Sequence, residues 1–107
     1  MYEKESNKVM KNLEDIIQIL KENDRILKER FKVKSIGVFG SVTRGEQKET
    51  SDIDVIVEFY EPVGWEIVDL KEFLEELLGV RVDVVTKKAA MRKSILWKSI
   101  EREVVYV

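Results

Sequence analysis

The 107-residue sequence contains no cysteine and no histidine. Without cysteine there can be no disulfide, no thiol catalysis and no zinc site built on sulfur. Without histidine the chain lacks the usual general base and any Ser-His or Cys-His nucleophilic pair. Any chemistry must therefore depend on carboxylates, lysine, arginine, hydroxyl groups and a bound ion.

The sequence also lacks long apolar segments. No apolar run approaches the roughly 18 to 20 residues that a membrane-spanning helix requires, and the N-terminus has no apolar region typical of a signal peptide. We therefore predict a cytoplasmic protein without a membrane partner. Hydrophobic residues make up 44% and charged residues 37% of the chain, which is typical of one globular domain, expected to span residues 1–107.

Charge is unevenly distributed along the chain. The net charge of −2 does not favour direct binding to nucleic acid. Residues 45–80 contain eleven acidic residues and two lysines, whereas residues 87–102 contain six basic residues and one acidic residue. Two interpretations remain open for this pattern. Both segments can be solvated helix faces, or the basic segment can contact an acidic partner or a triphosphate.

Apolar spacing predicts helices that pack on one small sheet, an α/β or α+β fold. A first helix is expected over residues 7–30, with Ser6 as a candidate N-cap and a break at Asn23-Asp24, where Asp24 would cap a second short helix. The remaining expected elements are strands over 34–39, 53–59 and 80–86, helices over 67–78 and 90–102, and a short edge strand over 104–107. Gly79 is well placed to end the helix that precedes it.

Two carboxylates occur one residue apart at the start of the second strand. Because alternate residues of a strand face the same side, Asp52 and Asp54 are expected to project together. Close carboxylates repel each other, and a divalent cation would relieve that repulsion. Asp83 interrupts the third strand and would join them if the two strands are neighbours. A cluster of three carboxylates suits Mg²⁺. Alternatively, Asp52 caps a turn and Asp83 pairs with Arg81 or Arg44.

A Gly-Ser turn follows the first strand. Gly40 permits an unusual backbone angle and Ser41 can cap a turn, which are purely structural roles. Both residues also suit a phosphate, because free backbone amides at the start of a short helix bind anions. Arg44 can either steady triphosphate oxygens or pair with the acidic loop.

Taken in order, these residues resemble a known signature. Gly40-Ser41, ten intervening residues and Asp52-Ile53-Asp54 are similar to the motif of the DNA polymerase β-like nucleotidyltransferase superfamily. The Arg44-Gly45-Glu46 turn and the Ser51-Asp52-Ile53-Asp54 ending resemble its minimal nucleotidyltransferase (MNT) branch. The resemblance implies a mixed sheet flanked by helices, with ATP as substrate and two Mg²⁺ ions.

The resemblance also implies a role for each residue of the motif. Asp52, Asp54 and Asp83 would bind the metal and carry catalysis, and Asp83 would accept the proton of the nucleophile. Gly40 and Ser41 would hold the β and γ phosphates, and Arg44 is a further candidate for contact with the nucleotide. An acceptor hydroxyl would attack the α-phosphate and release pyrophosphate, a reaction that positioning and charge neutralisation can support without histidine.

A chain of this size is expected to receive its acceptor from a partner protein. The resemblance implies that the partner is a HEPN-type ribonuclease toxin, modified with AMP on a tyrosine by this chain as its antitoxin. One alternative is neutralisation by binding alone, through the basic last helix and the segment from Met91 to Trp97. Tryptophan in such a helix is more often core than an interface anchor. Another alternative is a small-molecule nucleotidyltransferase, which would turn over without any protein acceptor.

Overall fold

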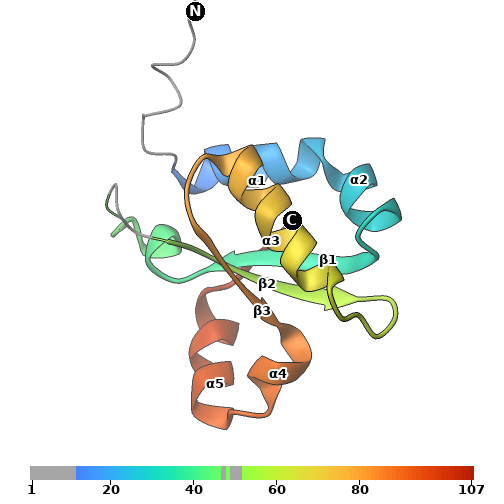
Figure 1. Cartoon of the computed structure of the whole chain (residues 1–107). Helices are drawn as coiled ribbons and strands as arrows, with labels where there is room; N and C mark the ends of the chain where they lie inside the picture. Colours follow the sequence, from blue (N-terminus) through green and yellow to red (C-terminus); the bar gives the residue numbers. More distant parts are fainter. Residues whose placement is uncertain (1–11, 47, 49–51) are drawn as a thin grey trace, which may run out of the picture.

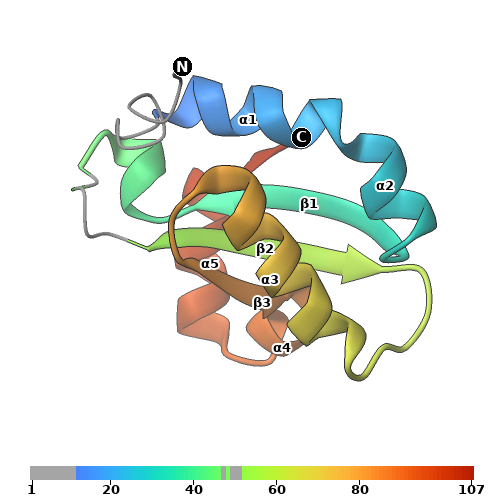
Figure 2. The same cartoon turned by 45° about the horizontal axis from the view of Figure 1, so that its top comes forward.

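The computed structural model describes residues 12–46, 48 and 52–107, which form one sheet with helices on both faces (Figure 1). The sheet has four strands in the order β3-β2-β1-β4. Helices α1, α2 and α3 lie on one side of it, and α4 and α5 lie on the other, an arrangement that is visible in both views (Figures 1 and 2). The predicted mixed sheet flanked by helices is therefore confirmed. Among the described helices none is long and apolar enough to cross a membrane.

The sheet is mixed because it contains both antiparallel and parallel strand pairs. Strand β1 (Val33–Phe39) pairs antiparallel with β2 (Ile53–Phe59) and with β4 (Val105–Tyr106). Strand β2 pairs parallel with β3 (Val82–Thr86). The bounds of β2 match the prediction, β3 begins two residues later than expected, and the short last strand lies at an edge as predicted.

The first predicted helix is interrupted where the sequence suggested. Helix α1 (Leu13–Glu22) begins after Asn12, which forms a capping box with Asp15, and α2 is Asp24–Glu29. The predicted N-cap Ser6 lies outside the described residues. The prediction that Asp24 caps α2 is wrong by one residue, since Asn23 occupies that position. The side-chain amide of Asn23 instead donates to the Ile19 carbonyl at 2.8 Å, which closes α1.

The two faces of the sheet bury separate apolar clusters. Val55 and Val57 of β2 belong to the larger cluster, under α1 to α3. Ile56 points to the opposite face, as strand alternation requires, and packs with Ala90 and Ile100 beneath α4 and α5. The face that carries Ile56 also carries the even-numbered positions of β2, which includes Asp54.

Helix α3 (Glu66–Leu78) ends at Gly79 with φ 72°, as expected.

The predicted basic helix over residues 90–102 is in fact two helices. Helix α4 (Lys87–Met91) begins directly after β3, because the Thr86 hydroxyl accepts from the Ala89 amide at 3.1 Å. A short turn then leads to α5 (Ser94–Glu103). The chain therefore folds back on itself to cover the second face of the sheet.

Candidate active site

The Gly-Ser turn connects the end of β1 to a short helix. Gly40 has φ 87° and ψ −156°, a conformation that residues with a Cβ atom avoid, and the 3₁₀-helix η2 (Ser41–Arg44) follows it. The Thr43 amide donates to the Gly40 carbonyl at 3.0 Å, and the Thr43 hydroxyl donates to the same oxygen at 2.7 Å. The short helix thus begins at Ser41 itself, with the amides of Ser41 and Val42 at its start.

Asp54 and Asp83 lie side by side on neighbouring strands. They are register partners in the parallel β2–β3 pair, so their side chains leave the same face of the sheet. That face is the one under α4 and α5, because Ile56 and Val85, two residues further along each strand, pack there. The condition set by the sequence, that the strand of Asp83 must neighbour the strand of Asp54, is met.

Asp52 precedes β2 and forms an ion pair of its own. Its Oδ1 atom lies 3.2 Å from Nε of Arg81. The sequence allowed Arg81 to pair with Asp83, but Arg81 pairs with Asp52 instead. Within the described part of the chain, no three acidic side chains are arranged to hold one metal ion. Asp52 would have to leave Arg81 to join the other two carboxylates at a common ion.

The electrostatics at Asp54 favour a cation. Partial burial raises the pKa of Asp54, and the negative charges of Asp83, Asp52 and Glu103 raise it further. These carboxylates repel one another, and a divalent ion would lower their electrostatic energy. Carboxylate oxygens are the ligands that Mg²⁺ prefers. In chemical type the three aspartates therefore suit Mg²⁺, but in the described structure only Asp54 and Asp83 lie side by side, and Asp52 is held by Arg81.

Gly40 and Asp54 are in direct contact across β1 and β2. A Cβ atom on Gly40 would overlap the Oδ2 atom of Asp54. The sequence suggested two separate reasons for the glycine, backbone conformation and phosphate approach. The structure adds a third, which is space for the Asp54 carboxylate. The phosphate-binding candidate and the metal-binding candidate thus form one continuous surface.

A further carboxylate, Glu103 at the end of α5, reaches the same turn. The Gly40 amide donates to Glu103 Oε2 at 2.9 Å, and Arg44 Nη1 donates to Glu103 Oε1 at 2.6 Å. Arg44 Nε also donates to Glu46 at 3.0 Å. Arg44 therefore pairs with the acidic loop, which was one of the two roles that the sequence allowed for it. Both carboxylates raise the pKa of Arg44, which keeps its positive charge beside the site. Sequence reasoning missed Glu103, because no motif marks it.

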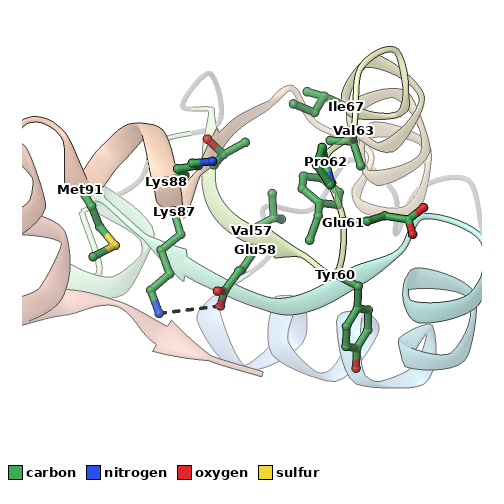
Figure 3. Close-up of a pocket in the computed structure, with 12 residues that line it drawn as sticks. Val57, Glu58, Tyr60, Glu61, Pro62, Val63, Ile67, Lys87, Lys88 and Met91 are labelled. Atoms are coloured by element: carbon green, nitrogen blue, oxygen red, sulfur yellow. Dashed lines mark ion pairs between the residues drawn. The ribbon is translucent and has the colours of Figure 1, made fainter.

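The structure also contains a cavity at the opposite end of the parallel strands. It has a volume of about 740 Å³ and lies among the end of β2, the loop after it, the start of α3 and helix α4 (Figure 3). Lys87 and Glu58 form an ion pair of 3.8 Å in this region. None of the predicted site residues lines the cavity. It is therefore a different place on the molecule from the carboxylates.

Comparison with known proteins places this geometry in context. The family model for the nucleotidyltransferase domain matches residues 20–106. The protein adenylyltransferase MntA of Thermococcus cleftensis is 50% identical over 99 residues, which cover 92% of this chain and 98% of the relative. A candidate protein adenylyltransferase of Methanocaldococcus jannaschii is 46% identical over 99 residues, covering 92% of this chain and all of the relative.

Solved structures agree with the sequence comparison. A structure described as a minimal nucleotidyltransferase superposes with a TM-score of 0.72 at 36% identity, covering 89% of this chain and 95% of the other. A toxin–antitoxin structure with AMP-PNP superposes with a TM-score of 0.63 at 26% identity, covering 87% of this chain and 69% of the other.

Proposed function

The chain belongs to the nucleotidyltransferase domain family, and on that basis we propose that it transfers AMP from ATP to a hydroxyl group of a partner protein. The observation that carries the proposal is that the aspartates of β2 and β3 lie against the Gly40 turn. Asp54 and Asp83 are register partners on one face of the sheet, and Asp54 contacts the Gly40 turn. Carboxylates for a metal and amides for a phosphate are then combined on a single surface.

The proposed reaction is a displacement at the α-phosphorus of ATP. A bond forms between the acceptor oxygen and the α-phosphorus, while the bond from that phosphorus to the bridging α–β oxygen breaks. Pyrophosphate leaves, and the proton of the acceptor hydroxyl passes to the Asp83 carboxylate, which is exposed to solvent. The amides of Ser41 and Val42, together with the Arg44 guanidinium, would hold the triphosphate.

Asp52, Asp54 and Asp83 would hold Mg²⁺, two ions in the arrangement that the family resemblance implies. When bound, the ions would neutralise phosphate charge and stabilise the attacking and leaving oxygens. Asp52 is available for this role only after it separates from Arg81, whose side chain is largely exposed. Ion pairs with such an exposed partner contribute little to stability, so separating this pair costs little free energy.

The relatives support a toxin–antitoxin role. The relative from T. cleftensis is named protein adenylyltransferase MntA, and the structure that is 26% identical is a toxin–antitoxin with an ATP analogue. We infer that this chain acts as the antitoxin of a HEPN-type toxin and that the acceptor is a tyrosine of that toxin. The inference assigns ATP as the donor and a protein, rather than nucleic acid or a membrane, as the partner.

Labelled ATP tests the proposal. The chain is incubated with Mg²⁺ and the protein encoded beside its gene, using ATP labelled at the α position in one sample and at the γ position in another. Transfer of AMP predicts label on the partner only from the α position. Label from the γ position would indicate phosphoryl transfer and would contradict the proposal, as would no label from either position.

Neutralisation by binding alone is the second candidate, and exposed apolar side chains favour it. Ile95, in the first turn of the basic helix α5, is 86% exposed, and Met91, at the end of α4, is 53% exposed. Trp97, which the sequence offered as the centre of such a surface, is partly buried in the second apolar cluster. A binding surface would therefore be centred on Ile95 and Met91. The two candidates differ in whether the aspartates are needed for neutralisation.

A further inference from the structure

Glu103 connects the last helix, α5, to the Gly40 turn at the candidate nucleotide site. It is the last residue of α5, 63 positions from Gly40 in the sequence, and it accepts the Gly40 amide at 2.9 Å. Its second oxygen accepts from Arg44 Nη1 at 2.6 Å. One carboxylate therefore holds both the backbone of the turn and the side chain that ends η2.

The location of Glu103 is unfavourable for a carboxylate in three respects. The carboxyl end of a helix carries partial negative charge, which repels an acidic side chain there. Glu103 also lies near enough to Asp54 for its charge to act on that residue. In addition, the Glu103 side chain is only 19% exposed, so it is largely removed from solvent. Its contacts with Gly40 and Arg44 are what offset these costs.

These contacts leave the turn suited to a phosphate. Glu103 occupies the Gly40 amide, but the amides of Ser41 and Val42 precede the first internal hydrogen bond of η2, which Thr43 makes. In Arg44, Nη1 is held by Glu103 and Nε by Glu46. With two of its three nitrogens fixed, the guanidinium has a defined plane, and among the contacts between described residues Nη2 makes none, so this atom can meet an anionic oxygen.

We propose that Glu103 is a positioning residue for the triphosphate of ATP, acting through Arg44 and the Gly40 turn. The inference rests on the proposed function, since it assigns a task to a residue beside that site. Glu103 does not touch the nucleotide; it orders two groups that do. The opposite role, a carboxylate that competes with phosphate for Arg44, predicts an effect of opposite sign, so measurement separates the two.

Nucleotide binding without turnover provides the test. The full chain is titrated by calorimetry with Mg²⁺ and the α,β-methylene analogue of ATP, which cannot undergo cleavage between the α and β phosphates. The variants are Glu103→Ala and Glu103→Gln, each alone and combined with Arg44→Ala. Glu101→Gln is the matched control, because Glu101 is an exposed residue of the same helix and its change removes the same charge.

Positioning through Arg44 predicts weaker binding by about tenfold for Glu103→Ala and about threefold for Glu103→Gln, which keeps an acceptor for the Gly40 amide. In the Arg44→Ala background only the contact with the Gly40 amide remains to be lost, so Glu103→Ala should weaken binding by no more than about threefold. The control should bind as the wild type does. Glu103→Gln keeps the inference testable if Glu103→Ala does not fold.

Three results would overturn the inference. Tighter binding by Glu103→Gln would identify a competitor for the phosphate site. Equal losses with and without Arg44 would identify a purely structural residue. Wild-type affinity in both Glu103 variants would show that the contacts do not matter, while leaving the proposed function intact. If the wild type itself fails to bind the analogue, the proposed function fails as well, so the two failures are distinguishable.

Discussion

Gly40 leaves the space that the Asp54 carboxylate occupies, since a Cβ atom on Gly40 would overlap Asp54 Oδ2. The antiparallel register explains the contact, because Phe39, immediately before Gly40, is the partner of Asp54. The glycine of one motif and the aspartate of the other are therefore required together. A change at either residue should disturb both the turn and the carboxylate cluster.

Substitution of Gly40 by alanine should be severe. The new methyl group would overlap Asp54, and the backbone conformation at φ 87° is strained for alanine. We expect a loss of roughly 2 to 4 kcal/mol in the free energy of unfolding, together with loss of nucleotidyl transfer. Urea denaturation measures the first and label transfer the second. Gly45→Ala is the control, because Gly45 also has positive φ but a Cβ atom there would meet nothing within 4 Å. Equal effects of the two changes would contradict the role of the contact.

Asp54→Asn should stabilise the protein in the absence of divalent ions. Burial and neighbouring carboxylates raise the pKa of Asp54, so the folded chain binds this proton more tightly than the unfolded chain does. The stability that comes from that proton is present at low pH and is lost as pH rises through the raised pKa. At pH 7 the ionised group therefore destabilises the fold. Asparagine removes this cost, and we expect a rise in Tm of about 2 to 5 °C.

The same thermal measurement tests the metal site. Millimolar Mg²⁺ should raise the Tm of the wild type, since an ion that binds only the folded chain stabilises it. The increase should be absent in Asp54→Asn. An equal increase in both proteins would place Mg²⁺ binding elsewhere on the chain.

Arg81→Gln should strengthen binding of Mg²⁺. Asp52 pairs with Arg81 at 3.2 Å, and it would have to leave that partner to bind an ion with Asp54 and Asp83. Arg81 is largely exposed in this pair, so the expected gain is modest, about two- to fivefold in affinity. Titration with Mn²⁺, followed by electron paramagnetic resonance, measures it. Weaker binding would show that Arg81 orients Asp52 for the metal rather than withholding it.

The strands of this fold follow closely from the sequence, and the helices less so. Strand β2 is an apolar run bounded by polar residues, and its bounds were predicted correctly. The last helical region was predicted only in part, because residues 94–102 are helical as expected, but the chain is interrupted after Met91 and its first helix begins earlier, at Lys87, where the Thr86 hydroxyl caps it. A cap of this kind begins a new helix at once, and periodicity alone does not detect it.

The residues of the candidate site could be predicted from the sequence only where local spacing or one strand pairing brings them together. Local spacing identified Gly40, Asp52 and Asp54, and one strand adjacency was enough to bring Asp83 beside Asp54. Glu103 could not be found in this way, since its contact with Gly40 depends on how α5 packs on the sheet. The Asp52–Arg81 pair depends on side-chain geometry, and the sequence offered Arg81 only as a partner of Asp83.

Changes on the last helix should separate stability from partner binding. Trp97→Ala should lower the free energy of unfolding by roughly 2 to 3 kcal/mol, because Trp97 packs against the second apolar cluster. Ile95→Asp should change it by less than about 0.5 kcal/mol, because Ile95 is 86% exposed. Denaturation curves measure both. If Ile95→Asp also abolishes complex formation with the partner while the fold is intact, the exposed apolar side chain is part of the interface.

The most direct measurement of the central claim is the mass of the partner after co-expression with this chain. The wild type is compared with the Asp52→Asn, Asp54→Asn double variant, and complex formation is monitored in both samples. Catalysis by the aspartates predicts a partner heavier by one or more AMP groups with the wild type. With the variant, it predicts an unmodified, still toxic partner that nevertheless forms the complex. An unmodified partner that both proteins neutralise equally would contradict nucleotidyl transfer and leave an antitoxin that acts by binding.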